Sequence, residues 1–409
     1  MRRLRILHTV QYYHPAVGGS EEVVRQVSER LAARGHDVTV ATAPHPERRQ
    51  SEYRGVRIVD FDLTGNAVKG IRGPDAGRYR RFLRESNFDV IMNYATQCWP
   101  TDLTYDLLPA LHGATVLATC GFSALKAGLR RLLYWRYFRS LPRYLHQYDL
   151  LIYHSDSYLD KQFGDRHGVR HYRVIPNAVD PTEFDMGAGL ASAAADFRRR
   201  YHIQTPYMLL NVSNHYRLKG HDFIRKAFSM LRRDDVTLVI IGRGAASRWD
   251  CTTVCYRAAA RNPRLRVLEV PRADVIAAYR AADVFVFGSR VECFPLVILE
   301  AMAAGVPFVS TDCGNVRELP GGVVVGTPAE MARRVSEILD HPQWGADLAA
   351  AGRKAVLTRY NWDMVVAQYE SAYFAAVERA RHRTAGAGRP ASRHPAAVVA
   401  GPTSGPVGT

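Results

Sequence analysis

Two glutamates that lie eight residues apart, Glu292 and Glu300, flank a proline in an otherwise apolar segment. Carboxylates accept hydrogen bonds from hydroxyl groups and stabilise positive charge that develops in a transition state. Pro295 lies between them and suits the first position of a helix, because its missing N–H would be unpaired there in any case. We therefore expect Glu292 in a loop and Glu300 inside a helix, with different chemical roles.

The helix start between these glutamates predicts an anion site. The short apolar run 284–287 is typical of a strand buried on both faces, and Gly305 and Pro307 end the helix that follows. The free N–H groups of Leu296 and Val297 should then lie at the carboxyl end of that strand, where open α/β sheets bind ligands. A phosphate placed there meets unpaired donors and the positive end of the helix dipole.

The segment from Glu292 to Val309 reads ECFPLVILEAMAAGVPFV. It resembles the E-x7-E motif of retaining glycosyltransferases of the family 4 type, which have the GT-B fold. The resemblance implies that Glu300 binds the ribose hydroxyls of a nucleotide-sugar donor and that Glu292 holds the sugar hydroxyls or the charge near the anomeric carbon. Cys293 stands where glycine is common, so this position must not need a positive φ. The donor-binding residues that the motif implies are Glu300, Phe294, Pro295, Leu296 and Val297.

A second segment, VSNHYRLKG at 212–220, follows a predicted strand and precedes a predicted helix. It resembles the family's "VGRLxxxKG" element, whose arginine and lysine hold the donor diphosphate. A fixed cation offsets the negative charge that builds up on a leaving diphosphate. Lys219 aligns with the family lysine, whereas Asn214 stands at the arginine position, among the donor contacts. We expect Arg217 to replace that arginine after a loop shift; the alternative is that Arg217 is a surface residue and Lys219 a lone contact.

Three shorter elements complete the resemblance. Gly242 and Gly244, in IIGRG, resemble an "IxGxGP" turn near the nucleobase, or serve only as a turn. Gly18 and Gly19, in PAVGGS, resemble a first-domain loop that faces the donor phosphates and the acceptor across the cleft, with a plain tight turn as the alternative. Cys120 stands where relatives often have a histidine that helps position the sugar.

The six cysteines are scattered, and only Cys251 and Cys255 are close in sequence. A C-x3-C pair without a second pair nearby is weak evidence for a metal site. We interpret these residues as ordinary reduced thiols. The sequence therefore predicts no metal site, no metal requirement and no cofactor apart from the donor substrate.

The chain is basic, with a formal net charge of +16 from 55 lysines and arginines against 39 acidic residues. Such a charge favours phosphorylated substrates or an anionic membrane, and no zinc finger or RNA-stacking signature points to nucleic acid. The segment 126–148 is basic and aromatic, and Pro142 should kink or interrupt its helix. An anionic lipid surface and an ordinary domain helix with a solvated arginine face both fit it. The expected apolar side is Tyr137, Leu141, Tyr144 and Leu145, and the expected basic side is Arg136, Arg139 and Arg143.

No apolar run approaches the roughly 20 residues of a membrane span. The first ten residues are too short and too quickly polar to resemble a signal peptide. We predict a cytoplasmic protein, for which a peripheral position at the inner membrane face is an option.

Strands and helices alternate in two series, which predicts two facing Rossmann-like, doubly wound α/β domains with a cleft between them, the GT-B architecture. Residues 1–190 are expected to form the acceptor-side domain and residues 205–360 the nucleotide-sugar-binding domain. A final helix at 361–380 should pack back on the first domain, as in the family. We expect the tail 381–409 to be disordered, because it has no acidic or aromatic residue and too little apolar surface.

Taken together, the resemblance implies a retaining glycosyltransferase that moves a sugar from a UDP- or GDP-linked donor to a hydroxyl acceptor, lipid-linked or a glycan. Glu292, Lys219 and Arg217 are the expected catalytic residues. The alternative is a noncatalytic nucleotide-sugar-binding or membrane-associated GT-B protein, to which Asn214 and Cys120 point. A GT-B phosphorylase or epimerase is a further alternative.

Overall fold

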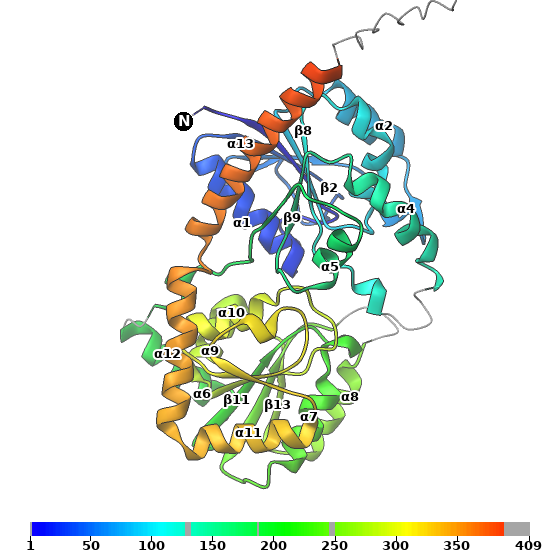
Figure 1. Cartoon of the computed structure of the whole chain (residues 1–409). Helices are drawn as coiled ribbons and strands as arrows, with labels where there is room; N and C mark the ends of the chain where they lie inside the picture. The colour runs from blue at the N-terminus through cyan, green and yellow to red at the C-terminus, as the bar shows by residue number, and fades with distance from the viewer. Residues whose placement is uncertain (1, 127–131, 186–187, 245–249, 388–409) are drawn as a thin grey trace, which may run out of the picture.

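The computed structural model describes residues 2–126, 132–185, 188–244 and 250–387. They form two α/β domains, one above the other in Figure 1, each with helices around a sheet. Within the described residues, no helix is both long and apolar enough to cross a membrane. The doubly wound α/β class predicted from the sequence is confirmed.

The sheet of the first domain has the order β10-β9-β8-β7-β1-β2-β4-β3, and its only antiparallel pair in the described residues is β3 with β4. Strands such as β9 are buried on both faces, which explains their continuous apolar sequence. The strands are β1 (Arg5–Thr9), β2 (Asp37–Thr42), β3 (Glu52–Tyr53), β4 (Val56–Asp60), β7 (Val90–Tyr94), β8 (Ala114–Ala118), β9 (Leu150–Tyr153) and β10 (Tyr172–Val174), beside a separate hairpin of β5 (Thr64–Asn66) and β6 (Gly70–Arg72). The helices are α1 (Gly19–Ala33), α2 (Ala76–Glu85), α3 (Trp99–Thr104), α4 (Trp135–Leu145) and α5 (Leu159–Arg166), with 3₁₀ turns η1 (Tyr105–Ala110) and η2 (Ser123–Lys126).

The sheet of the second domain is parallel throughout, with the order β13-β12-β11-β14-β15-β16. In chain order this is 3-2-1-4-5-6, the order of dinucleotide-binding domains. The strands are β11 (Tyr207–Val212), β12 (Val236–Ile241), β13 (Leu265–Leu268), β14 (Val284–Phe287), β15 (Phe308–Thr311) and β16 (Gly322–Val325). The helices are α6 (Ala188–Arg200), α7 (His221–Met230), α8 (Thr252–Arg261), α9 (Arg272–Ala281), α10 (Leu296–Ala303), α11 (Pro328–Asp340) and α12 (Pro342–Thr358), with 3₁₀ turns η4 (Pro181–Phe184), η5 (Arg217–Lys219) and η6 (Val316–Glu318).

The chain passes into the second domain earlier than the expected boundary at residue 190. Ile175 and Ala178 belong to a core cluster of the first domain, whereas Val179 belongs to one of the second. Phe184 and Phe197 are buried in that same second cluster. Their aromatic rings supply the apolar surface that attaches η4 and α6 to the second domain.

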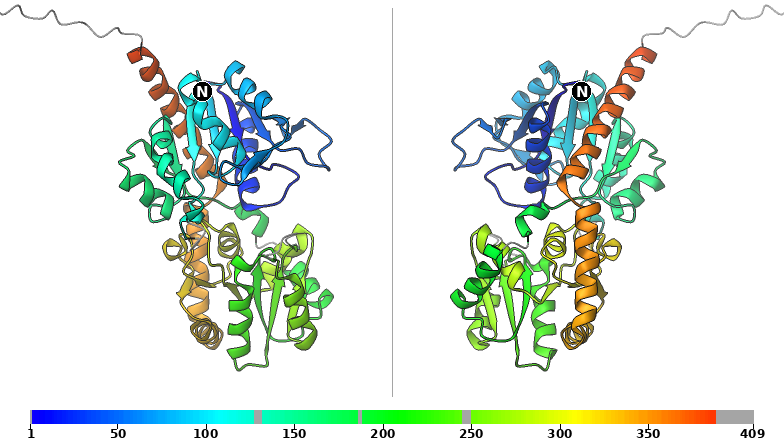
Figure 2. Two further views of the ribbon diagram at one scale, coloured as in Figure 1. Left: turned by 90° about the vertical axis from the view of Figure 1, so that its right-hand side faces the viewer. Right: turned by 90° about the vertical axis from the view of Figure 1, so that its left-hand side faces the viewer.

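The chain returns to the first domain between Tyr360, in the second core, and Trp362, in the first. The two passages lie side by side, because the N–H of Val179 donates to the carbonyl of Tyr360 at 2.9 Å. Helix α13 (Trp362–Ala387) then runs along the first domain (Figures 1 and 2). Its Tyr373 hydroxyl lies 2.8 Å from Nε2 of His8 in β1, which fastens the helix to the sheet.

Helix α13 continues to Ala387, so the prediction of disorder from residue 381 is wrong for residues 381–387. Alanine and arginine are strong helix formers, and this local preference extends the helix although the segment has little apolar surface to bury. The rest of the predicted tail, 388–409, lies outside the described residues.

Candidate functional site

The two loops with predicted chemistry meet at the switch point of the second sheet. Strands β11 and β14 are neighbours, and the sheet continues from them in opposite directions. Ligands of open α/β sheets bind at such a point, beyond the carboxyl ends of the strands. Residues 213–220, which we call the lysine loop, follow β11, and residues 288–295 follow β14. The topology alone therefore brings the lysine loop beside Glu292.

Lys219 and Glu292 form an ion pair between these loops, with Nζ 2.8 Å from Oε1. Ser289 donates its hydroxyl to the same carboxylate oxygen at 2.7 Å. The backbones also touch: Gly220 has a φ of 67°, and a Cβ added to it would lie 1.8 Å from the carbonyl oxygen of Gly288. Only glycine suits this left-handed position and this close approach. The loops therefore hold a cation and a carboxylate together at the end of the sheet.

Helix α10 begins one residue later than predicted, with Pro295 as its N-cap and Leu296 as its first residue. The N–H groups of Leu296 and Val297 belong to the first turn, where no intrahelical acceptor exists, and both residues are half-buried. The carbonyl oxygen of Phe294 accepts a hydrogen bond of 3.1 Å from the side chain of Asn177. Asn177, from the end of the first domain, thereby holds the backbone just before the helix start.

Glu300 lies on α10 and is held at both carboxylate oxygens. Arg272 donates to Oε1 at 2.6 Å, and the hydroxyl of Tyr279 donates to Oε2 at 2.9 Å. Arg272 also contacts Glu183 at 2.6 Å. Burial raises the pKa of Glu300, and the charge of Arg272 opposes that rise. The carboxylate is thus oriented by Arg272 and Tyr279, two residues that the sequence did not single out.

Arg217 is the first residue of η5 and is exposed, and its side chain makes no ion pair with any described residue. Asn214 is also exposed, and its Oδ1 accepts the backbone N–H of Arg243 at 3.3 Å. Neither side chain is engaged with Glu292, whereas Lys219 is. Of the three residues expected to be catalytic, the structure brings Glu292 and Lys219 together and leaves Arg217 exposed on the same loop.

The glycines Gly242 and Gly244 pack against the lysine loop. A Cβ on Gly242 would lie 2.0 Å from the carbonyl oxygen of Ser213, so the two backbones are in direct contact. Gly244 forms an isolated bridge with His215. Gly242 therefore permits the close approach of two loops that follow the neighbouring strands β11 and β12.

On the first domain, Gly18 and Gly19 mark the start of α1, where Gly18 is the N-cap and has an extended backbone with φ −175°. A Cβ on Gly18 would lie 2.2 Å from Oε2 of Glu21. Burial raises the pKa of this Glu21 carboxyl. Gly18 therefore leaves room for an acidic side chain that folds back on the helix start.

Cys120 follows β8 and adopts a left-handed backbone with φ 55°, an uncommon state for a residue other than glycine. Its neighbour Gly121 faces the second domain: a Cβ there would lie 2.7 Å from the ring of Tyr158 and 3.0 Å from Cβ of Cys293. Cys293 itself lies outside the positive-φ region, as its replacement of a common glycine requires. The end of β8 thus adjoins the glutamate motif across the domain boundary.

A family profile described as "Glycosyltransferase Family 4" matches residues 17–183, and one described as "Glycosyl transferases group 1" matches residues 206–341. The chain belongs to the glycosyltransferases. Both halves of this glycosyltransferase therefore carry a recognised domain of the family, and together the two domains span most of its length.

Curated relatives of this glycosyltransferase differ in their named products. It is 23% identical to N-acetyl-alpha-D-glucosaminyl L-malate synthase of Bacillus anthracis, over 88% of this chain and 95% of that protein. It is 28% identical to glycogen synthase of Mycobacterium tuberculosis, over 91% and 95%. It is 32% identical to D-inositol 3-phosphate glycosyltransferase of Salinispora tropica, over 52% of this chain and about half (47%) of that protein.

Solved structures place the glycosyltransferase in the GT-B fold, as the sequence predicted. Sucrose-phosphate synthase of Thermosynechococcus elongatus superposes with a TM-score of 0.73 at 20% identity, over 94% of this chain and 100% of that one. HepE of Anabaena, in complex with UDP-glucose, superposes with a TM-score of 0.74 at 18% identity, over 90% and 100%.

Proposed function

We propose that this glycosyltransferase transfers a sugar from a UDP- or GDP-linked donor to a hydroxyl acceptor with retention of anomeric configuration. The observation that carries the proposal is the Lys219–Glu292 pair at the switch point, next to the free N–H groups at the start of α10. A cation and a helix start together suit a diphosphate, and a carboxylate beside them suits sugar hydroxyls. That HepE binds UDP-glucose in the same fold supports the choice of donor class.

The proposed transfer uses the lysine loop and α10 on opposite sides of the diphosphate. Lys219, the extended Arg217 and the N–H groups of Leu296 and Val297 offset the charge of the leaving group. The bond from the anomeric carbon to the diphosphate breaks, and the acceptor oxygen bonds to that carbon on the same face. The acceptor proton passes to the departing phosphate oxygen, so no protein nucleophile or metal enters this step.

The ion pair with Lys219 underlies the proposed role of Glu292 in the reaction. Lys219 balances the Glu292 carboxylate, with Nζ 2.8 Å from Oε1. An incoming diphosphate takes over the positive charge of Lys219, and the carboxylate is then available to sugar hydroxyls and to charge near the anomeric carbon. Ser289 keeps the carboxylate oriented during this exchange.

The proposed role of Glu300 is to accept hydrogen bonds from the ribose hydroxyls, which requires its ionised form. Replacing Arg272 with glutamine removes the charge that opposes the burial-raised pKa of Glu300, so that pKa should rise further. More of the carboxyl is then protonated at mildly acid pH. We expect KM for the donor to rise about fivefold near pH 8 and more near pH 6, as measured by initial rates across pH.

A matched control for this variant is Arg333→Gln, which removes an exposed arginine paired with Glu337 on α11. Its KM and pH profile should equal those of the wild type. An Arg272→Gln enzyme whose KM rises by the same factor at every pH would contradict the electrostatic account of Glu300.

The proposed activity is tested by incubating the purified protein with UDP- and GDP-sugars and cell extract, followed by assay of released nucleotide and mass analysis of products. NMR of the product should show the anomeric configuration of the donor. Tight binding of a nucleotide sugar without turnover would instead identify a noncatalytic protein, the alternative to which Cys120 and Asn214 point. Phosphate-dependent turnover would identify a phosphorylase, and interconversion of UDP-sugars an epimerase.

We also propose that the acceptor side of the enzyme rests on an anionic membrane through the segment 132–143. Helix α4 continues through Pro142 to Leu145, so the proline does not interrupt it. Leu141 and Leu145, from the expected apolar side, are buried, and the expected basic side is exposed (Arg136, Arg139 and Arg143). Beside it, large apolar side chains face solvent: Leu132 is 73%, Leu133 69% and Trp135 56% exposed. Exposed apolar and basic residues side by side suit a lipid interface.

Replacing the three α4 arginines with alanine should weaken binding to anionic vesicles about a hundredfold, because each basic residue contributes roughly 1 kcal/mol near such a surface. Cosedimentation with phosphatidylcholine vesicles, with and without phosphatidylglycerol, measures the effect. Leu357→Ser, which alters an exposed leucine of α12, is the control and should bind like the wild type. Equal binding of the wild type to neutral and anionic vesicles would contradict the proposal.

A further inference from the structure

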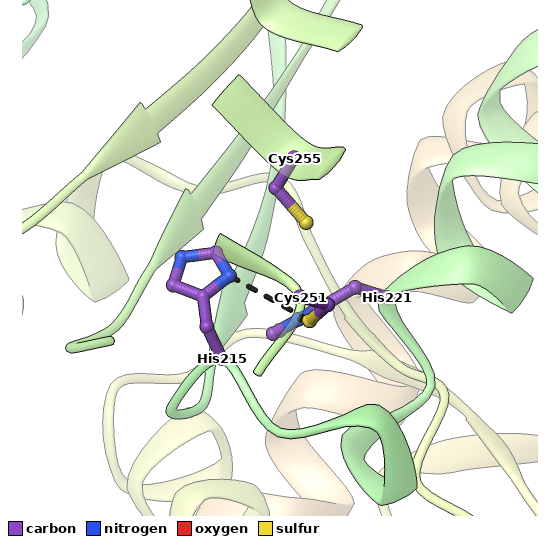
Figure 3. Close-up of side chains that lie close together, drawn as sticks. All are labelled: His215, His221, Cys251 and Cys255. Carbon is purple, nitrogen blue, oxygen red and sulfur yellow. Dashed lines mark hydrogen bonds between the residues drawn. The ribbon is translucent and has the colours of Figure 1, made fainter. Parts of the chain in front are cut away.

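The C-x3-C pair converges with two histidines behind the lysine loop, and the four side chains are His215, His221, Cys251 and Cys255 (Figure 3). One ligand atom of each lies within 4.8 Å of the ligand atoms of the others. Three of the four residues are buried, and Cys251 is half-buried. We propose that these residues form a structural zinc site that holds the lysine loop to helix α8.

The backbone positions three of these residues independently of any metal. The N–H of His215 donates to the carbonyl of Arg243 at 2.8 Å, and the N–H of Cys251 donates to the carbonyl of His215 at 3.3 Å. Cys251 is the N-cap of α8, and Cys255 lies one turn further along the same face. The C-x3-C spacing thus directs both thiols toward His215.

The fourth residue, His221, is the first residue of α7, and its hydrogen bonds define its tautomer. The amide Nδ2 of Asn211 donates to the carbonyl of Val286 at 2.9 Å, so its Oδ1 is free to accept the hydroxyl of Ser213, also at 2.9 Å. The Ser213 oxygen must then accept from Nε2–H of His221, 2.9 Å away. This leaves the lone pair of Nδ1 directed at Sγ of Cys251, at 3.2 Å. Metal-binding histidines are oriented in this way by the hydrogen bond of their second nitrogen.

His215 lacks any strong partner of its own. Its side chain is fully buried, its Nδ1 is 3.9 Å from Sγ of Cys251, and its Nε2 has no hydrogen-bond partner among the described residues. Buried polar groups are nearly always paired, and each exception calls for an explanation such as an ion. A metal ion bound between Nδ1 of His215 and Sγ of Cys251 would give this buried ring the one strong partner that it lacks on the side of the cysteines.

The ligand set selects zinc. Two thiolates and two imidazoles favour a borderline-soft ion in tetrahedral geometry. In such a site the ligand atoms lie about 3.3–3.8 Å apart, so the observed cluster closes around an ion with side-chain shifts on the order of 1 Å. Four protein ligands leave no open position for a substrate, so the ion organises structure and takes no part in the transfer.

The proposed metal site would also constrain the lysine loop. His215 and His221 bracket the segment that carries Arg217 and Lys219, so a metal bound to both histidines anchors both ends of that segment to α8. This consequence for donor binding rests on the proposed function, whereas metal binding itself does not. Removal of the ion should loosen the segment and raise the Kd for UDP about tenfold, the lower end of what lost positioning of a site costs.

The test is metal analysis of the full chain, purified without chelators from zinc-supplemented medium. We expect about one zinc per chain by plasma mass spectrometry. Exchange into Co²⁺ should give a thiolate-to-cobalt charge-transfer band and the strong visible bands of a tetrahedral site. Cys251→Ser with Cys255→Ser should abolish both signals, and so should His215→Gln, which leaves the thiols intact. Cys98→Ser, which alters a buried thiol of the first domain, should retain both.

Three outcomes would overturn the proposal: wild-type protein with neither zinc nor the cobalt bands, unchanged zinc in the variants, or a disulfide between Cys251 and Cys255 in unreduced protein. Circular dichroism of each variant separates loss of metal from loss of fold. The metal result is independent of transfer activity, so a zinc-bound protein without turnover refutes the proposed function alone. If the zinc-bound and the chelated protein bind UDP with equal affinity, the metal site stands, but its proposed effect on the lysine loop is refuted.

Discussion

Glu292→Ala should lower kcat/KM for sugar transfer by about 2–4 kcal/mol, roughly thirty- to a thousandfold, the cost of losing one preorganised polar contact to the transition state. The side chain is only 14% exposed and lies where the loops after β11 and β14 meet. No other described carboxylate is paired with Lys219. Nucleotide release at saturating and limiting donor concentrations measures the effect on kcat and on KM.

The fold should survive this change. Lys219 is 32% exposed, so after the loss of Glu292 its ammonium group still reaches water, and such pairs contribute little to stability. Glu292→Gln keeps the size and the contact with Ser289 but lacks the charge, and it should remain nearly as impaired as the alanine variant. Glu337→Ala, on the exposed face of α11, serves as the matched control. Turnover of Glu292→Ala within a factor of about three of wild type would refute the assigned role.

Lys219→Ala should lower kcat/KM by at least about a hundredfold, with a clear rise in the KM for the donor. The lysine contacts the diphosphate in both the ground state and the transition state of the proposed reaction, so both binding and turnover should suffer. Lys226→Ala, an exposed lysine on the adjacent helix α7, should change neither. Unchanged donor KM in Lys219→Ala would show that the diphosphate binds elsewhere.

The double variant tests whether the two residues act together. Because Nζ of Lys219 lies 2.8 Å from Oε1 of Glu292, loss of one alters the environment of the other. The combined loss in kcat/KM should therefore be smaller than the product of the two single losses. Independent, multiplicative losses would indicate that the resting ion pair has no part in the reaction cycle.

Local sequence signals were enough to predict the elements that carry the site. The apolar run at 284–287 became β14, and Pro295 placed the helix start within one residue. These features depend on backbone chemistry and on the burial of short segments, both of which are determined by neighbouring residues. The sequence did not predict that the chain enters the second domain near residue 179. Consecutive residues can join different cores, and only packing shows which core Phe184 and Phe197 enter.

Helix α12 contains two glycines, Gly345 and Gly352, which lower its intrinsic helix propensity. The structure shows a packing reason for the second glycine. A Cβ at Gly352 would lie 3.1 Å from Cγ of Met302 in α10 and 3.3 Å from Cα of Gly321. Gly352 therefore lowers the local helix propensity but permits the close contact of α12 with the domain core.

The partners within the site were beyond the reach of sequence patterns. Arg272 and Tyr279 come from α9, more than twenty residues before Glu300, and only the fold brings them to it. The histidine pair was missed for the same reason, since thirty residues separate His221 from Cys251. A search that combined H-x5-H with the later C-x3-C would have flagged the four residues, because both spacings are short and each follows a strand of the same sheet.

The two segments that connect the domains lie next to each other, which limits how the domains can move relative to one another. The first lies at Val179 and the second at Tyr360, and one hydrogen bond of 2.9 Å joins them. Two covalent links at a single point act as a pivot: one domain can tilt against the other while both links keep their length, whereas a sliding motion would stretch both. If the domains close around the proposed donor, we expect a rotation, absorbed by backbone torsions near Val179 and Tyr360.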